Sequence, residues 1–102
     1  MISDKARQLA YWVMSWGDGK AAQLNGMRRV KIGDDMVEGI EVRVQGRFDQ
    51  GTIVIVDDHR AMVNIVPKRK DDYAPFQQQV VTFEDLQDGM YQLEEVKLHM
   101  RV

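Results

Sequence analysis

Two histidines and several acidic pairs are the residues of this 102-residue chain whose types could do chemistry. Asp57-Asp58-His59 sets three potential metal ligands in a row. Adjacent strand residues point to opposite faces, so three neighbours seldom reach one ion, whereas aspartates in tight turns bond to nearby backbone groups. We therefore expect a turn here and no metal site, and we expect the same of Asp34-Asp35 with Glu38.

The sequence contains no set of residues that would be expected to converge for acid–base or nucleophilic catalysis. A histidine pair would have to meet at one site, but no spacing brings His59 and His99 together, and His99 is expected to face solvent on a C-terminal strand. The only serines, Ser3 and Ser15, lie outside a nucleophile elbow. The absence of cysteine excludes thiol nucleophiles, disulfides and zinc–thiolate sites. We predict that the protein is not an enzyme and needs no cofactor.

Two basic clusters, Arg28-Arg29-Lys31 and Lys68-Arg69-Lys70, are the candidates for binding an anion. The acidic pairs Asp34-Asp35 and Asp71-Asp72 follow them, and 14 basic against 16 acidic residues give a formal charge of -2. The long-range field toward nucleic acid is therefore weak, although an oriented patch can still act. Nucleic-acid binding is the alternative function, and its predicted residues are Arg28, Arg29, Lys31, Arg43, Arg47, Lys68, Arg69 and Lys70.

The composition is that of one folded domain spanning residues 1–102. Apolar residues make up 44% and charged residues 29% of the chain, which is enough to build a core and too little net charge for disorder. No apolar run approaches the roughly 20 residues that span a bilayer. The start, Met1-Ile2-Ser3-Asp4, does not resemble a signal peptide. We expect a cytoplasmic protein with no membrane partner.

A helix over residues 3–17 is predicted to open the fold. Leu9, Trp12, Val13 and Trp16 fall at i, i+3, i+4 and i+7 and form one apolar stripe. Two tryptophans on that stripe require the helix to pack on something. The run Gly17 to Lys20 follows a helix rather than a strand, so it indicates a helix end and not a phosphate-binding loop.

Residues 27–102 are predicted to be rich in β-structure. Strands are expected over 27–32, 40–45, 52–56, 61–66 and 78–83, and the strand 52–56 is apolar on both faces, as a central strand is. A turn at Asp88-Gly89 is expected to lead into a last strand with a bulge at Glu94-Glu95, because its apolar residues change parity there. The predicted fold class is α+β, with an N-terminal amphipathic helix packed on a bent antiparallel sheet of five to six strands.

The span from Gly39 to Leu86, about half the chain, resembles a small SH3-like barrel of the KOW or Tudor kind. The resemblance rests on Val42 to Val44, Gly51 to Asp57 and Met62 to Val66, and on 79–86 as a closing strand with one helical turn. It implies a barrel-like sheet. The N-terminal helix departs from the pattern, and no functional residue is transferred.

With no catalytic set, metal framework or strong field, the sequence favours a small non-catalytic protein-binding module. An adaptor, or an inhibitor that occludes a surface of a larger protein as small phage and mobile-element proteins do, fits this build. An exposed edge strand would also allow a homodimer or the addition of a partner strand. The residues predicted to contact the protein partner are Lys68, Arg69, Lys70, Tyr73, Phe76 and Tyr91.

Overall fold

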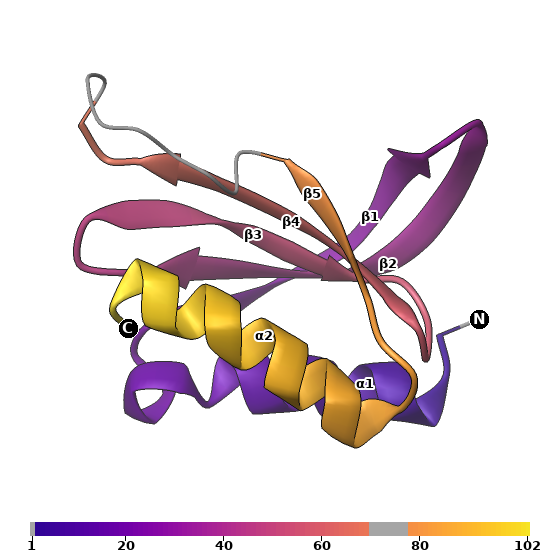
Figure 1. Ribbon diagram of the computed structural model, residues 1–102, viewed down its shortest axis with the longest axis horizontal. Coiled ribbons are helices and arrows are strands. Elements are labelled where there is room, and N and C mark those ends of the chain that lie inside the picture. The colour runs from indigo at the N-terminus through magenta and orange to yellow at the C-terminus, as the bar shows by residue number, and fades with distance from the viewer. Residues whose placement is uncertain (1, 70–77) are drawn as a thin grey trace.

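A computed structural model describes residues 2–69 and 78–102. Five strands form one antiparallel sheet in sequence order, and two helices cover one of its faces (Figure 1). This confirms the predicted α+β class, the N-terminal helix and the number of strands. The elements are α1 (Asp4–Met14), the 3-10 turn η1 (Trp16–Gly19), β1 (Ala22–Ile32), β2 (Asp35–Gln45), β3 (Asp49–Ile55), β4 (Arg60–Pro67), β5 (Gln79–Thr82) and α2 (Leu86–Met100).

Helix α1 begins and packs as its sequence predicts. The Ser3 hydroxyl accepts a hydrogen bond from the Ala6 N–H, which satisfies one free amide of the first turn. Ala6, Leu9, Ala10 and Val13 are buried against the sheet. The helix ends at Met14, earlier than predicted, and Trp16 continues the apolar stripe from η1 while being only 2% exposed. Gly17 takes the left-handed conformation (φ 57°) that a helix-ending glycine adopts without strain.

The central strands follow the predicted alternation. On β3, Ile53 and Ile55 join the core beneath the helices, while Val54 belongs to a second cluster with Met62 and with Val56, which directly follows the strand. Strand β1 extends the predicted segment 27–32 back to Ala22 and joins the main sheet through β2. Residues 22–26, which precede the predicted strand, therefore belong to β1 as well.

The second cluster is covered by the tip of the β1–β2 hairpin. Val30, Ile32 and Val37 pack against it, and Figure 1 shows the hairpin curving away from the helix side of the sheet. The pairing runs from β1 to β5, with no β1–β5 pair among the described residues. The described sheet is therefore strongly bent but has two edges, and closure into a barrel is not seen.

The predicted last strand is wrong, because residues 86–100 form helix α2. Its buried residues Gly89, Leu93, Val96 and Met100 are spaced by 4, 3 and 4, which is the helical period. The alternation of Val96, Leu98 and Met100 imitates a strand over a short window only. Asp85 caps the helix by accepting from the Asp88 N–H. The expected hairpin turn at Asp88-Gly89 and the bulge at Glu94-Glu95 both lie inside the helix.

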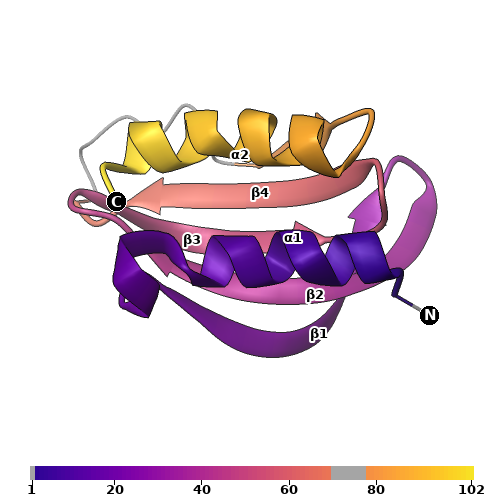
Figure 2. The same cartoon turned by 90° about the horizontal axis from the view of Figure 1, so that it is seen from below.

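The two helices lie side by side and run in the same direction (Figure 2). Five antiparallel strands lie between them in the chain, so the direction reverses six times, and an even number of reversals returns α2 to the direction of α1. Gly89 allows their close approach, since a Cβ there would lie 3.1 Å from Leu9 Cδ2 and 3.0 Å from Phe83 Cδ2. Neither helix in the described part of the chain is long and apolar enough to cross a membrane.

Candidate functional site

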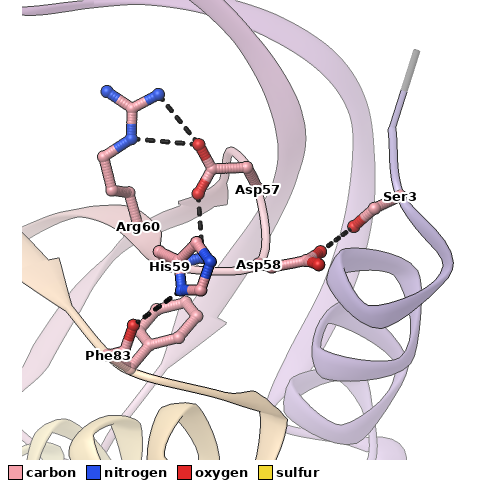
Figure 3. A network of polar contacts seen from close by, with 6 residues as sticks. All are labelled: Ser3, Asp57, Asp58, His59, Arg60 and Phe83. Atoms are coloured by element: carbon pink, nitrogen blue, oxygen red, sulfur yellow. Dashed lines mark hydrogen bonds and ion pairs between the residues drawn. The ribbon is translucent and has the colours of Figure 1, made fainter.

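The turn 57–59 sends its three potential metal ligands to different partners (Figure 3). The Asp57 carboxylate accepts hydrogen bonds from Arg60 Nε and Nη2, at 3.0 and 2.8 Å, and from the His59 N–H at 2.8 Å. Asp58 accepts from the Ser3 hydroxyl, and His59 Nδ1 lies 3.2 Å from the Phe83 carbonyl oxygen. The turn therefore ties α1 to the β5–α2 connection. No group of three or more metal-ligating side chains occurs among the described residues.

The same contacts set the acidity of Asp57. Burial by itself raises the pKa of this carboxyl, but hydrogen bonds from Arg60 and from the His59 N–H, together with the Arg60 charge, outweigh burial. The pKa of Asp57 therefore lies below its ordinary value of 3.8. This is the pattern of a structural ion pair and gives no acid or base suited to catalysis near neutral pH.

The two histidines lie apart, as the sequence predicts. His59 contacts the residue that precedes α2, whereas His99 lies in the last turn of that helix, about 20 Å further along its 15 residues. His99 is partly buried rather than facing solvent on a strand, and its Nε2 lies 4.0 Å from Asp49 Oδ2. No site joins the two rings.

The basic residues fall into separate groups. Arg28, Arg29 and Lys31 lie toward the β1–β2 tip, whereas Arg47 lies in the β2–β3 turn, where the Lys68 N–H donates to the Phe48 carbonyl. Arg29 pairs with Glu38 on β2, and seven residues of strand, about 20 Å, separate that position from the turn. Arg43 lies between the groups on the face away from the helices. The residues predicted for nucleic-acid binding therefore extend along the sheet and do not gather at one place.

The residues predicted for a protein partner are also scattered. Lys68 and Arg69 follow β4 and are exposed, and Tyr91 is 68% exposed on α2. Lys70, Tyr73 and Phe76 lie outside the described residues. A shallow hollow of about 610 Å³ lies between α1 and α2 beside Tyr91. Its rim carries Lys5, Asp85 and Glu94, so its mixed charges select no class of partner.

A better-defined surface lies between α1 and β1. A mostly apolar hollow of about 230 Å³ separates the helix from the strand. Tyr11, Leu24 and Met27 border it and are 65%, 49% and 52% exposed. We call it the α1–β1 groove; its lining residues are Arg7, Ala10, Tyr11, Met14, Leu24, Gly26, Met27 and Ile40.

Strand β1 is an edge of the sheet, so one side of its backbone has no partner strand among the described residues. It is 11 residues long and carries a bulge between Leu24 and Gly26. The buried Glu41 of β2 holds this bulge: its Oε1 accepts from Asn25 Nδ2, and its Oε2 lies 3.2 Å from Arg28 Nη1 in an ion pair without hydrogen-bond geometry.

Sequence reasoning missed this groove. Tyr11 lies off the apolar stripe predicted for α1, and Leu24 precedes the predicted strand 27–32, so neither residue indicated a shared surface. The usable signal was Leu24 and Met27 in a segment that is otherwise polar. Comparisons of the chain with protein-family models, with curated proteins and with solved structures found no match.

Proposed function

We propose that the protein is a non-catalytic protein-binding module that takes an extended segment of a larger protein along β1. The observation that carries the proposal is an apolar groove beside an edge strand whose outer side has no partner strand in the described ranges 2–69 and 78–102. Strand addition uses this combination, because backbone hydrogen bonds supply affinity and a neighbouring hollow accepts alternate side chains of the added strand.

The size of the groove supports a peptide side chain as its occupant. Small-molecule sites enclose about 300–1,000 Å³, and the α1–β1 groove, at about 230 Å³, is smaller. Its apolar lining suits one or two aliphatic side chains. The exposed Leu24, Met27 and Tyr11 would lose contact with water when such a strand is added, which favours binding.

Hydrogen exchange on the complex tests this. A stoichiometric partner is captured from lysate after nuclease treatment, and amide exchange is compared between the free and the bound protein. We expect slower exchange in residues 24–32 and unchanged exchange in β5. Protection elsewhere with none in β1 contradicts the groove, and a partner that is lost on nuclease treatment favours the nucleic-acid alternative.

A matched pair of variants sharpens the result. Met27→Glu places a charge in the groove and is expected to weaken partner binding by tenfold or more. Leu98→Glu changes a comparably exposed side chain on α2 (65% exposed) and is expected to leave binding unchanged. Loss of binding with Leu98→Glu alone would assign the contact to α2 instead.

A further inference from the structure

We infer that the segment bound along β1 is acidic at its N-terminal end and apolar at its C-terminal end, and that it pairs antiparallel to β1. This inference rests on the proposed function and adds the chemistry and the direction of the partner.

The side of β1 that faces α1 changes character along the strand. Leu24 and Met27 pair with Val42 and Ile40, which lie on the helix side of β2, and Arg29 and Lys31 follow on the same side. The helix side of β1 is therefore apolar where it borders the groove and cationic beyond the groove, toward the end of the strand. No acidic residue occurs in residues 22–32.

Helix α1 strengthens this gradient. It runs in the opposite direction to β1 (Figure 2), so Met14 and Tyr11 come to the apolar end and Arg7 to the cationic end. Arg7 lies 3.9 Å from Asp4, but the two side chains are 53% and 92% exposed, so this ion pair is weak. The Arg7 guanidinium is available to a carboxylate in the groove.

The acidic residues of the hairpin lie further from an added strand than its cations do. The acidic residues opposite the basic half of β1, Asp35 and Glu38, lie on β2. An incoming strand would lie about 4.8 Å from β1 and about twice that from β2. Arg29 and Lys31 form no ion pair within 4.0 Å among the described residues. The nearest charges that the segment meets are therefore positive.

The same charges disfavour a second copy of this chain as the occupant. Two β1 strands paired antiparallel across their basic halves would set Arg28, Arg29 and Lys31 against one another, and like charges directly opposite destabilise a sheet. With an acidic segment, the same basic residues of β1 form favourable cross-strand pairs.

The direction of the segment follows from the pairing, since an antiparallel ladder is the more stable per residue. In that pairing the N-terminal end of the segment lies beside the basic end of β1, so its acidic residues come first in its sequence.

Three labelled, end-blocked octapeptides test the inference by fluorescence anisotropy. The first, Glu-Thr-Glu-Thr-Ile-Thr-Leu-Thr, places acidic and then apolar side chains toward the groove. The second has the reverse order, and the third has lysine in place of glutamate. We expect the first to bind at least tenfold more tightly than the other two and to weaken as salt is raised.

A charge exchange gives the decisive control. The protein with Arg29→Glu and Lys31→Glu is expected to bind the acidic peptide about tenfold more weakly and to bind the lysine peptide instead. Both residues are exposed on the edge strand, so folding should be retained, and a thermal melt verifies it.

The outcomes separate this inference from the proposed function. Equal binding of the acidic and lysine peptides overturns the charge assignment, and tighter binding of the reversed peptide overturns the direction. If no peptide binds while the natural partner protects β1 from exchange, the inference fails and the proposed function stands. A β1-dependent dimer in sedimentation assigns the groove to a second copy and also overturns the inference.

Discussion

The two edges of the sheet differ in almost every respect that governs association. Strand β1 has 11 residues and lies beside a groove, whereas β5 has four residues and leads through the buried Phe83 into α2. A short edge offers few backbone groups to an incoming strand, and a long one offers many. The short length of β5 therefore limits strand addition at that edge. The β1 edge is long enough to accept a strand, and it carries basic side chains.

Two buried residues support the part of the fold beside β1. Trp16 follows α1 directly and belongs to the core cluster on which that helix packs. Glu41 fixes the bulge of β1 from the neighbouring strand. The predictions below remove these supports first and then those on the β5 side.

Trp16→Ala is expected to have the largest effect, a loss of about 3–5 kcal/mol in the free energy of unfolding, because it empties a buried site. Urea denaturation measures this loss. Trp16→Phe is the matched control: it keeps much of the apolar contact and removes an Nε1 that is buried without a hydrogen-bond partner. A loss below about 1 kcal/mol for Trp16→Ala would show that α1 is not held through this residue.

Glu41→Ala is expected to cost about 1–3 kcal/mol, since it leaves Asn25 and Arg28 without their shared partner. The effect should be local: amide exchange should become faster around the β1 bulge and should not change in β5. Glu38→Ala, an exposed neighbour on β2, serves as the control. Equal acceleration at both edges would contradict an anchor specific to β1.

Asp85→Ala acts on the β5 side by removing the N-cap of α2, at a cost of about 1 kcal/mol. Asp85→Ser keeps a capping oxygen and should retain most of that stability. Circular dichroism melts distinguish the two variants. Exchange in β1 should not change, and if it does, the two edges are coupled through the helices.

The smallest expected effect is the pH dependence due to Asp57. Because the pKa of this group is lowered by folding, its stabilisation is complete above the ordinary value near 3.8 and is lost as pH falls through the folded value. The free energy of unfolding of Asp57→Asn should therefore fall less than that of the unchanged protein between about pH 5 and pH 2. Asp34→Asn, in an exposed turn, is the comparison. If the free energy of unfolding falls equally with pH in Asp57→Asn and in the unchanged protein, the contact between Asp57 and Arg60 does not contribute to stability.

Much of the fold was predictable from local pattern. Residues 40–45 of β2 alternate between apolar and polar, and the two apolar faces of residues 52–56 correctly indicated a central strand. Helix α2 was missed because Val96 and Met100 fit both periods, the exposed Leu98 between them completes a strand-like alternation, and a helical start at Asp85 was interpreted as a single turn. A strand over these residues required a bulge at Glu94-Glu95, and this extra requirement was evidence against the strand interpretation.

The candidate site was less predictable, because it consists of residues far apart in the chain. Tyr11 and Met27 border one groove only because β1 is the edge strand under α1, and single-sequence patterns do not give strand order. The basic clusters were visible, but their separation along the sheet depends on register.

The parallel course of α1 and α2 has a consequence for rearranging the chain. Because five strands separate the helices, α1 starts at one end of the molecule and α2 finishes at the other (Figure 2). The molecule measures 37 Å along its longest axis. A circular permutant would therefore need a linker of roughly 11 extended residues to join the two ends. Copies fused in tandem, by contrast, can follow one another with a short connection.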